Sequence, residues 1–192
     1  AGTSPSPRSY DAAATRSQQR VKIQEPDKYM SRLDSFIRRV SAQRDCLNLA
    51  KELIEDTPGP VLELGLGNGR TYDHLRELFP DRAIFVFDRR IAAHPECIPN
   101  EKYMILGDIV ETLASATDRI GGKAALAHCD IGTGVKESNA KLIAEIAPLI
   151  DALMVRGGIV CSDQEYSVEN WSPEPLPAGI RSGRYFINRV GY

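Results

Sequence analysis

Short apolar runs alternate with segments of helical periodicity from residue 60 to the end of the chain, and this alternation restricts the fold more than any other feature. The apolar runs predict strands over 61–64, 83–87, 103–106, 124–129, 158–162 and 184–190. Between them, apolar residues at three- and four-residue steps predict helices over 71–79, 109–120 and 137–156. Short strands joined by crossover helices lie parallel in one sheet. We therefore predict an α/β fold with an open, mostly parallel twisted sheet and helices on both faces.

Two further segments precede the sheet. Residues 1–28 are rich in Ser, Pro, Ala and charged residues and contain few large apolar groups. Such a segment cannot offset the entropy of its own ordering, so we expect an extended arm held by its own domain or by a neighbouring subunit. Residues 29–56 carry apolar side chains at helical spacing and predict an N-terminal helical segment, which could be split near 41–45.

Size and charge narrow the class of protein. The 192 residues suffice for one domain with a full core, which we place at 29–192. The formal net charge of −2, with no strongly basic half, argues against nucleic acid as a partner. No apolar stretch has the length of a membrane span and no secretory signal is found, so no membrane partner is expected. The four cysteines form no CxxC pair, which favours a reduced, cytoplasmic setting.

A glycine-rich loop follows the first strand, in the stretch VLELGLGNGR at 61–70. Glycines that leave a strand of an open α/β sheet allow a ligand to approach the backbone closely. The spacing is GxGxG rather than the GxGxxG of dinucleotide folds, and Arg70 stands where that fingerprint needs its third glycine. Glu63 lies two residues before the first glycine and would repel a diphosphate. The loop is therefore better suited to a ligand with a cationic amino-acid head.

The motif ELGLGNG at 63–69 resembles the E/DxGxGxG signature of class I S-adenosylmethionine-dependent methyltransferases, a Rossmann-like family. Further features of that family follow in order: Asp88 ends the second strand, Gly107-Asp108-Ile109 follows the third, Asp130 ends the fourth, and RGGIVCSD at 156–163 leads into the fifth. The resemblance covers residues 60–164, which we take as a cofactor-binding core. Each feature alone is also common as a turn or a helix cap, but all of them fall at strand ends on one edge of the sheet.

The resemblance implies S-adenosyl-L-methionine as the cofactor and assigns roles to the strand ends. Asp88 would accept hydrogen bonds from the ribose hydroxyls, and Asp108 with the next backbone N–H would read the adenine. Glu63 and Asp130 would provide negative potential near the ammonium and the sulfonium. The implied cofactor-binding residues are Glu63, Gly65, Leu66, Gly67, Asn68, Gly69, Asp88, Arg89, Gly107, Asp108, Ile109 and Asp130.

The acceptor is less clearly indicated. After the fourth strand the chain reads CDIG, without the Asn/Asp-Pro-Pro-aromatic pattern of the enzymes that methylate amino groups of DNA adenine and protein glutamine. HCDIGTG and GGIVCSDQEY are instead similar to the macrocin and catechol O-methyltransferases. That resemblance implies Mg²⁺ on Asp130, Asp163 and Gln164, where the metal would lower the pKa of the acceptor hydroxyl. Gln164 and Gly132 depart from the macrocin pattern, which has an Asp and a candidate base there.

Three side chains are candidates for catalysis: Asp130, His128 and Asp163. Strand alternation places His128 on the same side of the sheet as Asp130, so it could act as a general base. The alternative for His128 is a hydrogen-bonded residue at the end of a strand. For Asp163 the alternative is a strand-end cap or an acid of the acceptor pocket without a metal.

The C-terminal segment 165–192 combines a stretch with Tyr166, Trp171 and several prolines with the last strand. Its place after the fifth strand predicts a lid over the acceptor, or alternatively a rigid interface loop. We expect the last strand to lack the hairpin that is usual in the family. An open sheet edge of this kind favours coverage by another subunit, hence a homo-oligomer, either a dimer or a tetramer.

The function predicted from these features is methyl transfer from S-adenosyl-L-methionine to a small-molecule acceptor, with a hydroxyl preferred over nitrogen or carbon. One alternative is a polyamine (aminopropyl) transferase that uses decarboxylated S-adenosylmethionine, in which Asp130 and Asp163 would bind a diamine. Another is a non-catalytic scaffold that binds S-adenosylmethionine.

Overall fold

The computed structural model describes residue 2 and residues 30–132 and 136–191. The chain divides into two compact units, residues 1–31 and 32–192, and every helix and strand of the described residues belongs to the second. The arm expected over 1–28 lies outside the described residues, apart from Gly2.

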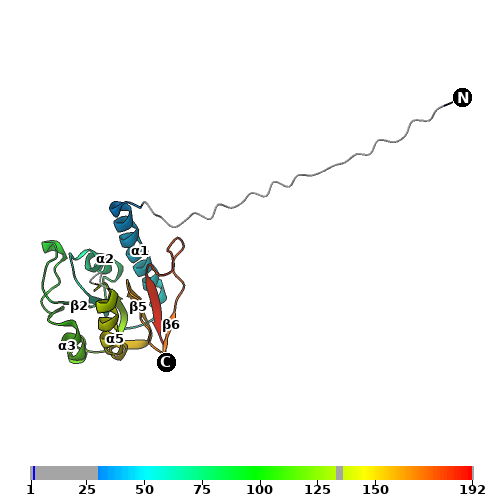
Figure 1. Cartoon of the computed structure of the whole chain (residues 1–192). Coiled ribbons are helices and arrows are strands. Elements are labelled where there is room, and N and C mark those ends of the chain that lie inside the picture. Colours follow the sequence, from blue (N-terminus) through cyan, green and yellow to red (C-terminus); the bar gives the residue numbers. More distant parts are fainter. Residues whose placement is uncertain (1, 3–29, 133–135, 192) are drawn as a thin grey trace. The chain divides into compact units, whose positions relative to one another are not determined.

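Seven strands form one sheet in the order β3-β2-β1-β4-β5-β7-β6 (Figure 1). The first five strands run parallel, and β7 runs antiparallel to both β5 and β6. This arrangement confirms the predicted α/β class with a mostly parallel, Rossmann-like sheet. The strands are β1 Val61–Leu64, β2 Ile84–Asp88, β3 Met104–Leu106, β4 Ala124–Cys129, β5 Met154–Ser162, β6 Trp171–Pro173 and β7 Phe186–Val190.

Helices cover both faces of the sheet, and each face has its own apolar core. On one face α1 and α2 pack against the sheet, and on the other face α3, α4 and α5 do so. The helices are α1 Arg32–Leu53, α2 Arg70–Leu78, α3 Ile109–Ala114, α4 Thr117–Ile120 and α5 Lys136–Leu153, with a 3-10 turn η1 at Pro95–Cys97.

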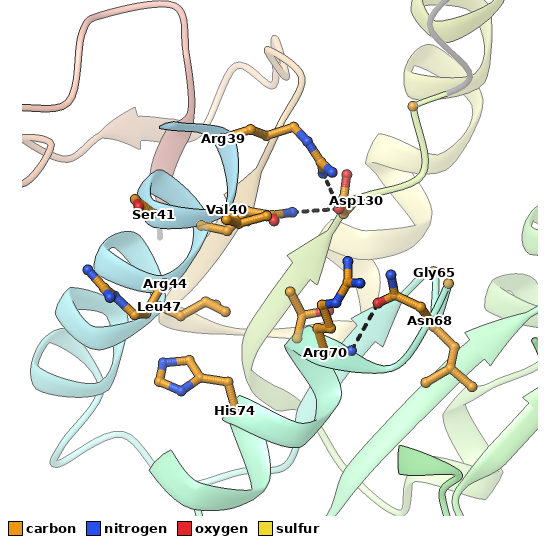
Figure 2. A pocket seen from close by; sticks show the side chains of 15 residues that line it. Arg39, Val40, Ser41, Arg44, Leu47, Gly65, Asn68, Arg70, His74 and Asp130 are labelled. Atoms are coloured by element: carbon orange, nitrogen blue, oxygen red, sulfur yellow. Dashed lines mark hydrogen bonds and ion pairs between the residues drawn. The ribbon is translucent and has the colours of Figure 1, made fainter. Parts of the chain in front are cut away.

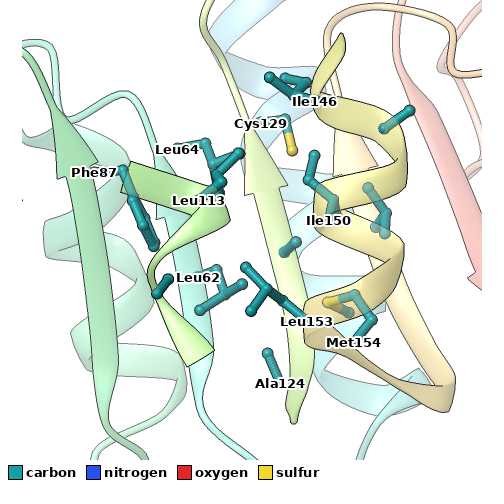
Figure 3. Packing of buried hydrophobic residues seen from close by; sticks show 14 of the residues in the cluster. Leu62, Leu64, Phe87, Leu113, Ala124, Cys129, Ile146, Ile150, Leu153 and Met154 are labelled. Carbon is teal, nitrogen blue, oxygen red and sulfur yellow. The ribbon is translucent and has the colours of Figure 1, made fainter. Parts of the chain in front are cut away.

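The two cores follow from the alternation of side chains along buried strands. Leu62 and Leu64 of β1 pack with Ile150 of α5 in the core on the α3, α4 and α5 side, as Figure 3 shows. Val61 faces the opposite core, below α1 and α2. Glu63 shares that face, so the acid of the glycine motif is directed into the α1 and α2 side of the sheet.

The first helix is continuous, so the possible break near 41–45 does not occur. Only the second half of α1 packs on the sheet, with Cys46, Leu47 and Ala50 fully buried. In the first half the apolar stripe stays open to solvent: Leu33 is 67% and Ile37 48% exposed. The N-terminal half of α1 therefore extends past the packed core (Figure 1).

Two element boundaries differ from the sequence-based expectation. The helix expected over 109–120 is two helices, and the first ends at its C-cap Ser115, whose backbone N–H and hydroxyl both donate to the carbonyl oxygen of Glu111. The fifth strand starts at Met154 instead of 158, and Met154 pairs with Ala124 before a register shift. Gly157, with a φ of 83°, allows the backbone to bulge there.

The prediction that the last strand lacks a hairpin partner was wrong. β6 pairs antiparallel with β7, with Trp171 opposite Val190 and Pro173 opposite Asn188. β7 therefore lies inside the sheet, and the edge strand is the three-residue β6, with a proline that cannot donate. Because β6 covers β7, an open β7 edge no longer supports the expectation of a second subunit. The homo-oligomer stays a prediction.

Arg82 joins the end of α1 to the start of the sheet. Its guanidinium donates to the carbonyl oxygens of Ile54 at 3.0 Å, Thr57 at 2.7 Å and Gly59 at 3.1 Å. Because three carbonyl oxygens would lose a charged hydrogen-bond donor, we expect Arg82→Met to lower the free energy of unfolding by about 2 kcal/mol. Urea unfolding would measure this, with exposed Lys141→Met as the control. An equal effect of both substitutions would contradict a role for these three bonds.

Candidate functional site

The strand order reverses between β1 and β4, which are neighbours in the sheet although β2 and β3 lie between them in sequence. Ligands of open α/β sheets bind at such a switch point, beyond the carboxyl ends of the strands. The glycine loop leaves β1 there and Asp130 follows β4. Gly65 has a φ of 97°, and a Cβ added to it would lie 2.8 Å from the carbonyl oxygen of Asp130. Only glycine therefore lets the loop pass so close to β4.

Asp88 anchors the glycine loop from the neighbouring strand β2. Its Oδ2 accepts the backbone N–H groups of Leu66 at 2.9 Å and Gly67 at 3.1 Å. Its Oδ1 accepts the backbone N–H of Arg90 at 3.2 Å. The carboxylate is thus fixed at the strand end and remains partly exposed, which leaves acceptor capacity for hydroxyl groups of a ligand.

The acid after β3 lies next to this position. Asp88 is opposite Leu106 in the sheet, and Gly107 donates its backbone N–H to the carbonyl oxygen of Asp88 at 3.1 Å. The Oδ1 of Asp108 caps α3 by accepting the N–H of Val110, while its Oδ2 lies 3.5 Å from the Arg89 guanidinium. Asp108 is thus a helix cap, as the alternative interpretation expects. Its side chain is nevertheless 44% exposed beside Asp88.

A pocket of about 570 Å³ opens between α1 and the glycine loop. Figure 2 shows α1 on one side, the start of α2 on the other, and Asp130 at the end of β4 between them. The structure brings the loop and Asp130 together here, as predicted, whereas Asp88 and Asp108 lie beside the pocket at the β2 and β3 ends. The lining residues are Arg39, Val40, Ser41, Gln43, Arg44, Leu47, Gly65, Leu66, Gly67, Asn68, Arg70, Thr71, His74, Asp130 and Gly132.

Two side chains of α1 hold Asp130, and the sequence-based reasoning missed both. The Gln43 amide donates to Asp130 Oδ2 at 2.5 Å, and the Arg39 guanidinium lies 3.5 Å from the same oxygen. Gln43 is 4% exposed although it is polar. The sequence did contain a signal for this contact: Gln43 lies within the apolar stripe of the predicted helix, and Arg39 lies one turn before it.

Glu63 and His128 form a buried pair below the pocket. They are register partners on β1 and β4, and His128 Nδ1 lies 2.5 Å from Glu63 Oε2. The Thr71 hydroxyl donates to the other carboxylate oxygen. Both side chains of the pair are 0% exposed, and neither lines the pocket. The structure therefore does not bring His128 to the acceptor opening, nor Glu63 into direct reach of a cofactor ammonium.

The ionisation of His128 follows from its partner. Burial opposes the charged imidazolium, but the charge and the hydrogen bond of Glu63 outweigh it and raise the pKa of His128 above its ordinary value. The ring is fully buried with Nδ1 held by Glu63, and it does not line the pocket, so it does not contact an acceptor there. This arrangement corresponds to the hydrogen-bonded strand-end alternative more closely than to a general base.

The proposed Mg²⁺ ligands do not fit a divalent ion. Asp130 lies beside the Arg39 guanidinium, which would repel a metal cation. The Gln164 amide nitrogen donates to Asp163 Oδ2 at 3.0 Å, so this carboxylate oxygen is already bound to a hydrogen-bond donor. Within residues 30–132 and 136–191, no group of three His, Cys, Asp or Glu side chains could hold a metal ion.

Asp163 has one oxygen, Oδ1, that is buried without a hydrogen-bond partner among the described residues. Burial raises the pKa of this carboxyl and the charge of Asp130 adds to the rise, whereas the Gln164 hydrogen bond opposes it. A Cβ added to Gly132 would lie 2.8 Å from Asp163 Oδ2, so glycine replaces the candidate base there because Asp163 fills the space.

The C-terminal segment does not present its aromatic residues to the pocket. Tyr166 and Trp171 are buried in the core on the α5 side, with ring centres 5.8 Å apart. The indole N–H of Trp171 donates to Asp151 of α5 at 2.8 Å. These side chains attach the segment to the sheet, and the lid remains a prediction for the rest of 165–192.

Comparison with known proteins agrees with this geometry. Residues 30–190 match the family described as S-adenosyl-L-methionine methyltransferase. One similar solved structure is the crystal structure of an S-adenosyl-L-methionine methyl transferase from Silicibacter pomeroyi DSS-3. The two sequences are 45% identical, the match covers 84% of this chain and 99% of the Silicibacter chain, and the TM-score is 0.79. No curated protein matches the sequence.

More distant solved structures share the fold alone. CalS11, a TDP-rhamnose 3′-O-methyltransferase of calicheamicin biosynthesis, is 17% identical over 84% of this chain and 82% of that chain, with a TM-score of 0.57. MycE of the mycinamycin pathway is 13% identical over 81% of this chain and 48% of that chain, with a TM-score of 0.52. No helix in the described part of the chain is long and apolar enough to span a membrane.

The family match spans most of the chain, and the sheet order, the glycine loop and the acids at the strand ends agree with it. The chain therefore belongs to the S-adenosyl-L-methionine methyltransferase family, and it is an enzyme that uses this cofactor.

Proposed function

We propose that the protein transfers the methyl group of S-adenosyl-L-methionine to a hydroxyl group of a small molecule that enters the pocket between α1 and the glycine loop. The observation that supports this most is the pocket itself, about 570 Å³ in volume, which contains both the loop and Asp130. A cavity of this size takes a small molecule. A cytoplasmic setting remains part of the proposal.

The strand ends divide the cofactor site into two parts. In this proposal Asp88 and Asp108, which are neighbours at the ends of β2 and β3, bind the ribose and the adenine. The glycine loop connects them to the pocket, because Asp88 holds the loop through Leu66 and Gly67. The methionine part of the cofactor would then lie along the loop towards Asp130. Glu63 acts in this scheme by holding β1, β4 and Thr71 together.

The cofactor supplies a methyl group on a sulfonium that is open to in-line displacement. The protein has to hold the acceptor in line, and orientation of this kind contributes about 7–11 kcal/mol. Asp130 is the group that contacts the acceptor in this proposal: Gln43 and Arg39 fix it, and its carboxylate can accept the hydroxyl hydrogen. His128 and Asp163 stabilise the strand ends around it.

Charge favours a hydroxyl over an amine. Arg39 and Arg70 line the pocket and would repel a protonated amine. The same groups disfavour the aminopropyl-transfer alternative, since a diamine would have to displace Arg39 from Asp130. The scaffold alternative is tested by turnover.

Release of S-adenosylhomocysteine from S-adenosyl-L-methionine, measured across paired hydroxylated and aminated small molecules, tests the proposal. We expect turnover with hydroxylated members and little with their amino analogues. Turnover confined to amines, or to decarboxylated S-adenosylmethionine with a diamine, would contradict it. Absence of turnover across the panel, together with tight cofactor binding, would favour the scaffold.

Metal removal gives a separate prediction. Because Arg39 occupies Asp130 and the donors around Asp163 do not fit Mg²⁺, we expect EDTA to change the turnover rate by less than about twofold. The control is the same assay with Mg²⁺ restored after EDTA. A large loss in EDTA that Mg²⁺ reverses would show that the pocket recruits a metal.

A further inference from the structure

Two arginines from different helices converge on the pocket. Arg39 lies on α1 and Arg70 is the first residue of α2. Their guanidinium carbons lie 5.5 and 5.7 Å from the ring centre of Phe36, so one aromatic ring supports both groups. Figure 2 shows both side chains directed toward the space beside Asp130, whereas Arg44 points away from it.

These two arginines leave the pocket with more positive than negative charge. Arg39 shares Asp130 with Gln43, and its 3.5 Å distance to the carboxylate is longer than that of the Gln43 amide. For Arg70 no ion pair with an acidic side chain is found among the described residues, and the residue is exposed. Arg44 already has a partner, since its guanidinium lies 2.8 Å from Asp45. Asp130 is therefore the one carboxylate that lines the described pocket, against Arg39, Arg70 and the Asp45-paired Arg44.

The cofactor does not neutralise the excess positive charge of the pocket. S-adenosyl-L-methionine carries a sulfonium, an ammonium and a carboxylate, so it adds one net positive charge to the pocket. Arg39 shares Asp130 with Gln43, and Arg70 has no acidic partner among the described residues, so an anion in the pocket would give both guanidinium groups a partner. A negatively charged group on the second substrate would supply that partner. The planar guanidinium fork suits a carboxylate or a phosphate.

We infer that the methyl acceptor carries a carboxylate or phosphate group, which Arg39 and Arg70 bind while the reacting hydroxyl faces Asp130. The inference rests on the proposed function and names the substrate class of the same site. Phe36 has a defined part in it, since its ring lies against both guanidinium groups.

The cofactor's own carboxylate is a second source of the same chemistry, and the experiment has to separate the two. The first arm compares the affinity for S-adenosylhomocysteine with that for methylthioadenosine, which lacks the amino-acid part. The variant is Arg39→Gln/Arg70→Gln. The control, Arg32→Gln/Lys141→Gln, removes the same charge at exposed positions outside the pocket. We expect the affinity of both nucleosides to be retained in both variants.

The second arm titrates inorganic phosphate and benzoate into the full-length protein saturated with S-adenosylhomocysteine. We expect saturable binding of at least one anion, weakened at least about tenfold by Arg39→Gln/Arg70→Gln and unchanged in the control. The inference is overturned if neither anion binds, or if the variant binds it as tightly as the wild type. It is also overturned if the variant loses affinity for S-adenosylhomocysteine but keeps methylthioadenosine, because the arginines then serve the cofactor.

Failure of the proposed function has a different signature. Turnover confined to amines in the paired panel would contradict the hydroxyl proposal whatever the anion titration gives. Anion binding without any hydroxyl turnover would retain the anionic pocket and reject the reaction. Binding of methylthioadenosine and S-adenosylhomocysteine serves as the positive control that the cofactor site is intact in every sample.

Discussion

Replacing His128 with leucine is expected to lower the free energy of unfolding by about 3–5 kcal/mol, because it leaves a buried carboxylate without its charged partner. Glu63 and His128 are both 0% exposed, with 2.5 Å between Oε2 and Nδ1. Among the described residues, the Thr71 hydroxyl would be the remaining side-chain donor to the Glu63 carboxylate in the variant. Urea unfolding at pH 6 compares the variant with the wild type.

The double substitution Glu63→Leu/His128→Leu is the decisive control. Removing both charged groups relieves the penalty of an unpaired carboxylate, so the double variant is expected to be more stable than His128→Leu alone. If the two losses simply add, the pair carries no coupling and the interpretation is wrong. A loss for His128→Leu below about 1 kcal/mol would also contradict it.

The same pair predicts how stability depends on pH. The folded-state pKa of His128 is raised, whereas the imidazole of the unfolded chain has a pKa of about 6.5. The stabilisation is therefore fully present below the unfolded pKa and is lost as the pH rises through the folded one. The stability difference between wild type and His128→Leu should shrink on the alkaline side. A difference that grows with pH would show that His128 is neutral in the folded protein.

The sheet class and the acids at the strand ends were predicted well, because both depend on short stretches of sequence. Alternating apolar runs gave the sheet class, and the acids at positions 88, 108 and 130 stand at the carboxyl ends of β2, β3 and β4, because strand ends are visible as changes in composition. β6 was missed since it has only three residues and includes a proline. The break between α3 and α4 at Ser115 and Ala116 was missed because the apolar spacing continues across it.

The contacts around Asp130 and Glu63 could not be read in the same way. Arg39 and Gln43 reach Asp130 across 91 and 87 residues, because α1 packs beside the carboxyl end of β4. His128 was assigned to the correct face, but the register that places it opposite Glu63 is a tertiary property of β1 and β4. That register changes His128 from a candidate base into the partner of a buried acid.

The second large effect is expected at Asp88. Asp88→Asn should weaken binding of S-adenosylhomocysteine by about 100-fold, because hydrogen bonds from two ribose hydroxyls to a carboxylate contribute about 1.5–3 kcal/mol each. The amide oxygen can still accept the N–H groups of Leu66 and Gly67, so the glycine loop should keep its conformation, whereas the N–H of Arg90 loses its acceptor. Isothermal titration measures the affinity. The matched control is Asp81→Asn, an exposed acid at the opposite end of β2.

A deoxy ligand separates the ribose contact from the support of the loop. If Asp88 acts on the ribose, the wild type should bind 2′-deoxy-S-adenosylhomocysteine much more weakly than the parent, whereas Asp88→Asn should discriminate little between them. If Asp88 acts only through Leu66 and Gly67, both proteins should discriminate equally, since the loop contacts do not involve the 2′-hydroxyl. Equal discrimination would reassign Asp88 from a ligand contact to an anchor of the glycine loop. The ribose would then have to be bound elsewhere along the β2 and β3 edge.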